Sequence, residues 1–311
     1  MRFFTEHIFT RAAAAFVALG ITATAYAETF DLSPEQAGQV RIKPNEKAIA
    51  ALPADFKLVT PGKFTVGINP WVPPISTYAT DAKTIVGFDP DIVKLVADGL
   101  GLELVLVPTA WADWPLALQS GKVDAVVSNI TVTEARKEKF DFSTYRDDLL
   151  GFYVKSDSPI NKISEPKDVA GLRIITGAGT TQEKIVQDWD KQNIAAGLAP
   201  IELQYYDDDA VRNLAIQSGR ADAVFHINST QAYQARTDGK TKLVGTVNGG
   251  WPLTAQVGVT TRKGNNIADA ITIVLNGAIE SGAYNQILDR WGLADEKVSK
   301  SETNPAGLPK T

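Results

Sequence analysis

Short runs of β-prone apolar residues alternate along this chain with segments whose apolar positions recur every three to four residues. Residues 64–68 and 102–107 are strand-like, and residues 87–97 between them show the pattern of an amphipathic helix. Asp89 is expected to cap that helix, with Pro90 at its first helical position. Its buried stripe is expected to comprise Ile92, Val93, Leu95 and Val96. This strand–helix–strand spacing predicts parallel strands joined by right-handed crossovers, as in an α/β protein.

One helix–turn–strand pattern occurs twice in the chain. Residues 116–126 read LALQSGKVDAV, and residues 214–224, 98 positions later, read LAIQSGRADAV, with eight of eleven positions identical. In the first copy a helix ends at Gly121, where glycine tolerates a left-handed conformation, and a strand-like run follows at residues 123–127. Such close identity at one wide spacing predicts two similar α/β halves. Two halves that face one another enclose a cleft.

The alternation of strands and helices continues to the C-terminal region. The remaining strand-like and helical segments are expected at residues 149–154, 173–176, 182–189, 201–205, 256–260, 267–280 and 285–291. We therefore expect one lobe at residues 56–149 plus 252–311 and a second lobe at residues 150–251. The chain would cross between the lobes twice, near residues 148–151 and 251–256, and two such crossings are typical of a hinge.

Residues 1–27 have the features of a secretory signal peptide. Two arginines supply positive charge, residues 12–25 are apolar and small, and Ala25-Tyr26-Ala27 fits the cleavage motif. The alternative is a membrane anchor, but about 14 apolar residues are too few, since a spanning helix needs roughly 20. We expect cleavage after Ala27 and export to the periplasm, with residues 28–55 forming a polar N-terminal extension.

The composition excludes several kinds of chemistry. The chain has no cysteine, and one of its two histidines, His7, lies in the predicted signal peptide. Disulfides, thiol catalysis and zinc–thiolate sites are therefore excluded, and a histidine-based metal site is not expected. The net charge of −5 provides no basic surface for nucleic acid. We expect no cofactor, no metal and no nucleic-acid partner.

Candidate binding residues follow the strand of the first repeat. Ser128, Asn129 and Thr131 are small or polar, and Thr133 can cap a short helix that carries Arg136 in its first turn. Open α/β sheets bind ligands beyond the carboxyl ends of their strands. The planar donor fork of arginine matches a carboxylate. These residues therefore predict a binding site for a carboxylate.

Five stretches of the chain, in order, resemble the solute-binding proteins of polar amino-acid ABC transporters, family 3. They are GFDPD at residues 87–91, LQSGKVDA at 118–125, TVTEAR at 131–136, FDFS at 140–143, and Gly282-Ala-Tyr with Trp291-Gly. The resemblance covers roughly residues 60–295. It implies a two-lobed periplasmic binding protein of type II, in which each lobe is a mostly parallel sheet flanked by helices. It further implies delivery of an amino acid or a derivative to an inner-membrane ABC permease. We expect a monomer that is not an enzyme.

The resemblance also implies ligand positions in both lobes. Trp71 and Trp111 match aromatic residues that enclose the ligand, although core positions are the alternative, and Arg136 matches the arginine that binds the α-carboxylate. Trp114 is expected in the core. Further contacts are implied for Ser128, Asn129, Thr131, Thr180, Thr181, His226, Ile227 and Asn228. Asn129 is bulkier than the small residue that the resemblance implies at its position.

Two positions depart from the family pattern. Ile227 stands where relatives carry the aspartate that accepts the α-ammonium, and Ile68 stands where many carry another aspartate. Because an ammonium buried without an acceptor is costly, we hypothesise a carboxylate ligand without a free α-amine, such as an opine, a sugar conjugate or an organic acid. The alternative is an ordinary amino acid whose amine binds Asn228 and the His226 carbonyl. The amine could also be bound by one of Asp113, Asp147 and Asp148.

Two other functions are compatible with the same scaffold. An exported dehydratase-like enzyme would need a positioned general acid or base in the cleft, and Ile227 occupies the place best suited to a carboxylate. A ligand-sensing module for a chemoreceptor would use the same ligand chemistry as a transporter. The sequence therefore favours a binding protein over an enzyme, and it leaves transport and sensing open.

Overall fold

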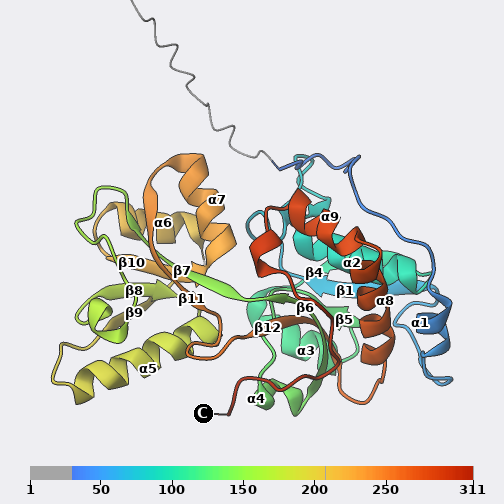
Figure 1. Cartoon of the computed structure of the whole chain (residues 1–311). Helices are drawn as coiled ribbons and strands as arrows, with labels where there is room; N and C mark the ends of the chain where they lie inside the picture. The colour runs from blue at the N-terminus through green and yellow to red at the C-terminus, as the bar shows by residue number, and fades with distance from the viewer. Residues whose placement is uncertain (1–29, 207, 311) are drawn as a thin grey trace, which may run out of the picture.

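The chain folds into two α/β lobes. The computed structural model describes residues 30–206 and 208–310, so the predicted signal peptide lies outside the described residues. Figure 1 shows two five-stranded sheets side by side, each with its own helices. We call the sheet that contains β1 (Lys63–Ile68), with its helices, lobe 1, and the sheet that contains β10 (Ala223–Ile227), with its helices, lobe 2. The two-lobed α/β fold expected from the sequence is confirmed.

The sheet of lobe 1 is mixed, with one strand reversed. Its strands lie in the order β4 (Glu103–Pro108), β1, β5 (Ala125–Val126), β12 (Gln256–Arg262) and β6 (Phe140–Asp147). β1 is parallel to β4 and β5, whereas β12 is antiparallel to both of its neighbours. Four of the five strands therefore run in one direction. β1 is buried along nearly its whole length, as expected for a parallel strand covered on both faces.

The sheet of lobe 2 repeats this design. Its strands lie in the order β11 (Thr241–Asn248), β7 (Leu149–Lys155), β10, β8 (Arg173–Thr176) and β9 (Glu202–Tyr205), and β7 is antiparallel to both neighbours. The two copies of the sequence repeat supply β5 and β10, the central strands of the two sheets. The turns before them use Gly121 at φ 74° and Gly219 at φ 70°, a conformation that favours glycine.

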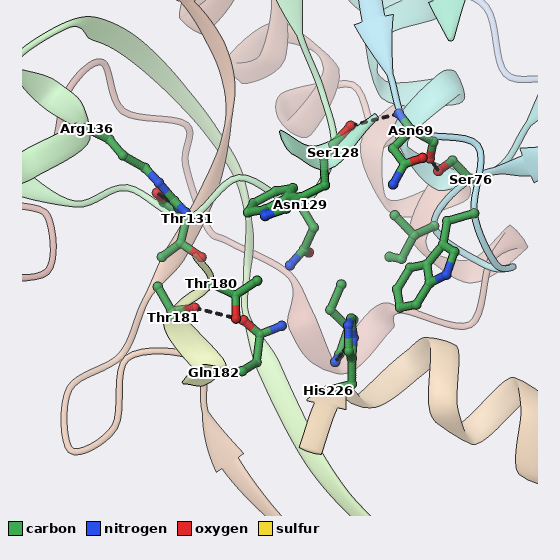
Figure 2. A pocket seen from close by; sticks show the side chains of 14 residues that line it. Asn69, Ser76, Ser128, Asn129, Thr131, Arg136, Thr180, Thr181, Gln182 and His226 are labelled. Atoms are coloured by element: carbon green, nitrogen blue, oxygen red, sulfur yellow. Dashed lines mark hydrogen bonds between the residues drawn. The ribbon is translucent and has the colours of Figure 1, made fainter. Parts of the chain in front are cut away.

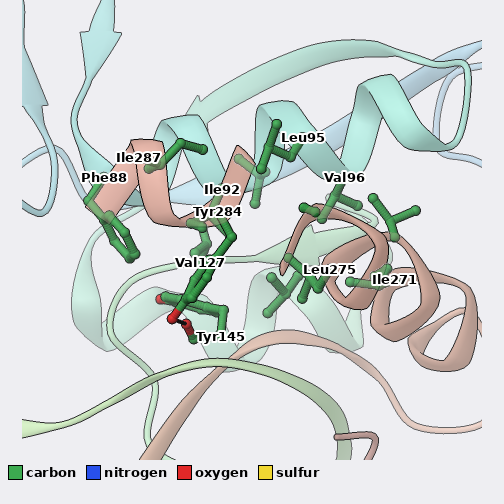
Figure 3. Close-up of a cluster of buried hydrophobic side chains, with 14 of the residues drawn as sticks. Phe88, Ile92, Leu95, Val96, Val127, Tyr145, Ile271, Leu275, Tyr284 and Ile287 are labelled. Atoms are coloured by element: carbon green, nitrogen blue, oxygen red, sulfur yellow. Dashed lines mark hydrogen bonds between the residues drawn. The ribbon is translucent and has the colours of Figure 1, made fainter. Parts of the chain in front are cut away.

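Helices cover both faces of the lobe 1 sheet. One face carries α2 (Phe88–Gly99), α8 (Ala268–Glu280) and α9 (Ala283–Arg290), which pack on one another. Figure 3 shows Val96 of α2 close to Leu275 and Ile271 of α8, within one buried apolar cluster. The other face carries α3 (Trp114–Gln119) and α4 (Glu134–Lys137), and Trp114 is buried there as expected. Apolar side chains on both faces of the sheet therefore hold this lobe together.

Lobe 2 has a smaller core built around stacked aromatic rings. Its helices are α5 (Thr181–Ala195), α6 (Asp209–Gln217) and α7 (Asn228–Asp238). The Phe152 ring of β7 stacks on Phe225 of β10 at 4.0 Å and on Trp189 of α5 at 5.5 Å between centroids. This stack fixes α5 against the sheet, and the first turn of α5 borders the cleft described below.

Helix α2 begins two residues earlier than the expected cap implied. The prediction that Asp89 caps it is wrong, because the cap position is Gly87 at φ 141° and Asp89 lies inside the first turn. A Cβ atom on Gly87 would lie 2.4 Å from the Ile75 carbonyl oxygen, so the backbone passes there too closely for any side chain. The Asp89 carboxylate points inward, where it accepts hydrogen bonds from the Tyr145 hydroxyl at 2.9 Å and the Asn129 backbone N–H at 3.2 Å.

Two chain segments connect the lobes. Asp148 joins β6 to β7, and residues 249–255 join β11 to β12. The segments are hydrogen-bonded to one another, since the Asp148 backbone donates to Ala255 at 2.8 Å and accepts from Gly249 at 2.8 Å. We propose the lobe boundaries at these two connections.

The N-terminal extension lies on lobe 1. It contains α1 (Glu46–Ala50), and its apolar side chains pack against the main core of that lobe. Shorter elements complete the fold: β2 (Thr77–Tyr78), β3 (Ile85–Val86), and the 3-10 turns η1 (Trp111–Asp113), η2 (Pro166–Val169) and η3 (Ala294–Glu296). Within residues 30–206 and 208–310, no helix has the length and apolarity needed to cross a membrane.

Candidate functional site

A cavity of about 100 Å³ lies between the two lobes. Lobe 1 lines it with Asn69, Trp71, Ile75, Ser76, Trp111, Ser128, Asn129, Thr131 and Arg136, and lobe 2 with Thr180, Thr181, Gln182, His226 and Ile227. Figure 2 shows Arg136, Thr131, Thr180 and Thr181 toward one end, with Asn69, Ser76 and His226 toward the other. The cavity therefore has an arginine end and a histidine end.

Ten of the eleven residues predicted as ligand contacts line this cavity, and Asn228 does not. Asn228 is the first residue of α7, and its amide oxygen accepts a hydrogen bond from the Tyr153 hydroxyl at 3.0 Å. Four lining residues were missed by the sequence argument: Asn69, Ile75, Ser76 and Gln182. The position of Gln182, directly after the predicted contact Thr181 in a helix first turn, was a usable signal. An irregular loop carries the other three residues, Asn69, Ile75 and Ser76, and its course decides whether they line the cavity.

Arg136 closes one end of the cavity. Thr133 caps α4 and accepts from the Arg136 backbone N–H at 3.0 Å. The guanidinium donates to the Thr131 carbonyl at 2.9 Å and, across the cleft, to the Gly179 carbonyl at 3.4 Å. Burial lowers the pKa of Arg136 to about 10, so the group is still cationic at neutral pH. Among the described residues, no carboxylate forms an ion pair with it.

The N-terminus of α5 faces the same end from lobe 2. Thr180 is the cap residue, and its hydroxyl accepts from the Glu183 N–H at 3.2 Å while donating to the Gly177 carbonyl at 2.6 Å. The N–H groups of Thr181 and Gln182, in the first turn, have no acceptor within the helix. Such a helix end favours an anion through its free N–H groups and its dipole.

Asn129 forms the floor of the cavity and explains why a bulky amide is present there. Its backbone has φ 50°, which asparagine tolerates better than most residues. Its amide nitrogen donates to Asp148 at 3.1 Å, and its amide oxygen accepts from the Arg146 guanidinium. The Thr131 hydroxyl also donates a hydrogen bond to the second oxygen of the Asp148 carboxylate, at 3.5 Å. The floor of the cavity is thus tied to one of the two connections between the lobes.

Arg146 lies at the centre of a buried ionic network behind this floor. Its side chain is fully buried and forms an ion pair with Glu296. Burial raises the pKa of Glu296 to about 7 and that of Asp89 to about 6, and it also raises the pKa of Asp148, while the charge of Arg146 opposes each shift. These charges do not line the cavity, so we assign the network to positioning Asn129 rather than to contacting a ligand.

The other end of the cavity is formed by rings from both lobes. The Trp71 ring lies 4.5 Å from the His226 ring between centroids, and the Arg212 guanidinium lies 5.2 Å from the Trp71 centroid. At the arginine end, the Trp111 ring lies 5.6 Å from the Arg136 guanidinium, and its indole N–H donates across the cleft to the Ala178 carbonyl at 3.3 Å. Direct contacts between the lobes at both ends show that the cleft is closed in this structure.

Acidic side chains are absent from the described part of the cavity wall. Ile227, buried and 6% exposed, occupies the position where the family resemblance implied an aspartate. Asp113, Asp147 and Asp148, which the sequence left open as acceptors for an amine, do not line the cavity. Asp148 lies beneath the floor, where its carboxylate already binds Asn129 and Thr131.

Comparisons with known proteins agree with this architecture. The profile of the bacterial extracellular solute-binding proteins, family 3, matches residues 64–294. The L-cystine-binding protein TcyJ of Escherichia coli K12 is 28% identical over 236 residues, which cover 75% of this chain and 84% of TcyJ. The arginine-binding protein ArgT of Corynebacterium glutamicum is 27% identical over 308 residues, covering 96% and 97% of the two chains.

A solved structure with the same fold is an ancestral arginine-binding protein bound to arginine. It has a TM-score of 0.64 and 28% identity, and the match covers 74% of this chain and 98% of that one. Since the family profile spans most of the chain and the fold agrees, the chain belongs to the bacterial extracellular solute-binding proteins of family 3.

Proposed function

We propose that this protein is the periplasmic substrate-binding component of an ABC importer. It captures an amino acid or an amino-acid derivative by its carboxylate, between the lobes, and delivers it to an inner-membrane permease. One observation carries this proposal: Arg136 from lobe 1 and the N-terminus of α5 from lobe 2 line the same end of one cavity. Two independent positive features meet there, one from each lobe.

The chemistry of that end suits a carboxylate. A guanidinium has five N–H donors. In Arg136, each of the two terminal nitrogens donates one hydrogen bond to a carbonyl group of the protein. Further N–H groups are offered by Thr181 and Gln182 in the first turn of α5. A carboxylate placed between them would receive charge-assisted hydrogen bonds from both lobes, away from bulk water.

The same arrangement supports a closure mechanism. A solute that binds lobe 1 through Arg136, Trp71 and Trp111 gains the contacts of Thr180 and Thr181 when the lobes close. Ligand favours closure by as much as it binds the closed state more tightly than the open one. The closed monomer would then present surfaces of both lobes to the permease. Export and cleavage after Ala27 would place the mature protein in the periplasm, where such a permease receives solute.

Replacing Arg136 tests this proposal. The protein is unfolded and refolded to remove bound solute, a thermal-shift screen of carboxylic acids and amino acids identifies a ligand, and calorimetry measures its affinity. Arg136→Ala should weaken binding about 30-fold or more, because removing one partner of a buried charge pair costs roughly 2–5 kcal/mol. Arg220→Ala, at an exposed position outside the cavity, is the control. An Arg136→Ala variant that binds as tightly as the native protein contradicts the assignment.

Catalysis is the less well supported alternative. Among the described lining residues, Arg136 and His226 are the ionisable ones. Burial and the charge of Arg212 lower the pKa of His226 well below its ordinary value of 6.5, so this ring takes up no proton near neutral pH. A binding protein returns its ligand unchanged, which NMR of the released solute checks.

Loss of uptake in cells that lack the protein separates transport from a purely sensory role.

A further inference from the structure

The described cavity wall carries no carboxylate, and several of its neutral hydrogen-bond acceptors are already engaged. The amide oxygen of Asn129 accepts from Arg146, and the carbonyl of Thr131 accepts from Arg136. The amide oxygen of Gln182 accepts from the neighbouring threonine hydroxyl at 3.2 Å. The donors left for a ligand are the remaining guanidinium N–H groups, the first N–H groups of α5 and the Gln182 amide N–H groups. The acceptors left at the histidine end are neutral, namely the Asn69 amide oxygen and the Ser76 hydroxyl oxygen.

His226 adds a donor at the end opposite Arg136. Its Nδ1 accepts a hydrogen bond from the backbone N–H of Ile227 at 2.8 Å. Because burial and the charge of Arg212 lower the pKa of this ring well below 6.5, the ring is neutral and its single proton must sit on Nε2. The ring cannot exchange its two nitrogens by tautomerisation without losing the bond from Ile227. His226 is therefore held as a donor, against the face of Trp71.

We propose that the cavity selects carboxylic acids whose second polar group is a hydrogen-bond acceptor rather than an ammonium, and that His226 Nε2–H is the specificity-determining donor for that group. The acceptor is a carbonyl, an amide oxygen, a hydroxyl or a second carboxylate. This inference rests on the proposed function, since it places the first carboxylate at Arg136. It names the class of ligand for the same cavity.

The physical reason is the mismatch that an ammonium would meet. An ammonium has three donors and no acceptor. In this cavity it would face the His226 N–H, the apolar Ile227 and neutral oxygen acceptors, with no carboxylate on the described wall to balance its charge. A buried ammonium that meets neutral acceptors alone recovers only part of the hydration that it loses. An oxygen acceptor at the same place would satisfy the His226 donor.

Matched ligands test the inference on the refolded mature protein. The first series is L-glutamate, 2-oxoglutarate and N-acetyl-L-glutamate, and the second is L-alanine, pyruvate and N-acetyl-L-alanine. Calorimetry should show that an acid without the ammonium binds at least tenfold more tightly than the amino acid of its series. An amino acid that binds as tightly as its counterparts, together with weaker binding of all by Arg136→Ala, overturns the inference and leaves the proposed function standing. Absence of binding by every acid overturns both.

Variants of His226 test the donor itself. His226→Phe keeps an aromatic ring beside Trp71 but removes the donor, and it should weaken binding of the tightest acid about tenfold, as expected for a buried hydrogen bond. His226→Gln restores an amide N–H and should recover most of that loss. A purely packing role for the ring predicts the reverse order, with the phenylalanine variant binding better than the glutamine variant. That order would overturn the assignment of His226.

Discussion

Asn129 shows how one side chain can serve the cavity and the hinge together. The family resemblance implied a ligand contact at this position, and the residue does line the cavity. Both ends of its amide, however, are bound to the charged groups Arg146 and Asp148 behind the floor. The amide therefore shapes the cavity while connecting its floor to the Asp148 crossing between the lobes.

Asn129→Gly should destabilise the protein by about 2–3 kcal/mol, because buried charged groups lose hydrogen-bond partners. Glycine accepts the positive φ of this residue, so the change isolates the side-chain bonds from backbone strain. Asn266→Gly is the matched control, since Asn266 has φ 56° and is exposed. Urea unfolding measures both variants. Equal stability of the two would show that the network contributes nothing.

Glu296 should make stability depend on pH. Burial raises its pKa to about 7 in the folded protein, whereas an unfolded glutamate titrates near 4.3. The folded state therefore holds a proton that the unfolded state releases. The contribution of Glu296 to the free energy of unfolding thus falls as pH rises from about 4.5 to 7, by up to about 1.4 kcal/mol per pH unit.

Glu296→Gln should remove most of that slope near pH 7, where Asp89, with a pKa of about 6, is already largely ionised. Unfolding free energies at several pH values check this, with Glu280→Gln at an exposed position of α8 as control. An unchanged slope in Glu296→Gln would contradict the role of this carboxyl.

Most cavity residues were located by the family resemblance, which supplied positions such as Trp71 and His226. Arg136 follows a cap threonine after a buried strand, and Thr180 precedes a helix, so these two positions also agree with local rules. Asn228 does not line the cavity, because it is one residue past the end of β10, where α7 begins and its side chain bonds to Tyr153. Asn69 and Ser76 were missed because the loop that carries them has no periodic pattern.

At the scale of elements, the N-terminus of α5 is the feature on which the cavity depends most. Its cap threonine fixes where the helix starts, and so where the free N–H groups point. The sequence placed this start to within a residue but ended the helix near residue 189, while α5 continues to Ala195. The final turns of α5 are polar and lack the apolar stripe of an amphipathic helix. Asn193 is nevertheless buried there and donates to the Pro166 carbonyl at 2.7 Å. Tertiary bonding of this kind cannot be seen in a local pattern.

Thr180→Ala should cost about 1 kcal/mol of stability through loss of the cap, and it should also weaken ligand binding, because the first turn frays beside the cavity. Asn45→Ala is the matched control, since Asn45 caps α1 through two N–H groups and lies outside the cavity. It should lose stability and keep its affinity for ligand. Calorimetry and urea unfolding on both variants separate the two effects. Unaltered affinity in Thr180→Ala would argue against the helix end as part of the site.

At the scale of the whole molecule, the extension joins lobe 1 to lobe 2. Figure 1 shows the start of the described chain passing between α7 and α9. The Phe30 ring lies 5.4 Å from Trp291 of lobe 1 and stacks at 5.6 Å on Tyr233 of α7. Residues nearby are fixed to lobe 1, for example by Arg290 donating to Gln36 at 2.6 Å. Opening of the cleft must separate Phe30 from one of its two partners.

Phe30→Ala should therefore shift the protein toward the open form. An aromatic pair contributes about 0.5–1.5 kcal/mol beyond its buried area, enough to change the ratio of closed to open molecules by about two- to tenfold. Small-angle X-ray scattering of the ligand-free variant should report a larger radius of gyration than that of the native protein. Leu32→Ala, which removes packing within lobe 1, should leave the radius of gyration unchanged. Equal radii for Phe30→Ala and the native protein would contradict this role.

The arrangement of the lobes was accessible from the sequence through its internal repeat. Two copies of one helix–turn–strand unit supply the central strands of the two sheets. The degree of closure was not accessible, because it depends on contacts between residues far apart in the chain, such as Trp111 with Ala178 and Phe30 with Tyr233. Such contacts carry no local signature.

Binding of a carboxylate between Arg136 and α5 can be tested by changing the ligand rather than the protein. Calorimetry would compare the tightest-binding acid with the amide in which that carboxylate is replaced by a carboxamide of nearly the same shape. We predict that the acid binds and that the amide binds at least about 30-fold more weakly, because the charge-assisted bonds are lost. Equal affinity for acid and amide would show that Arg136 and α5 do not bind a carboxylate.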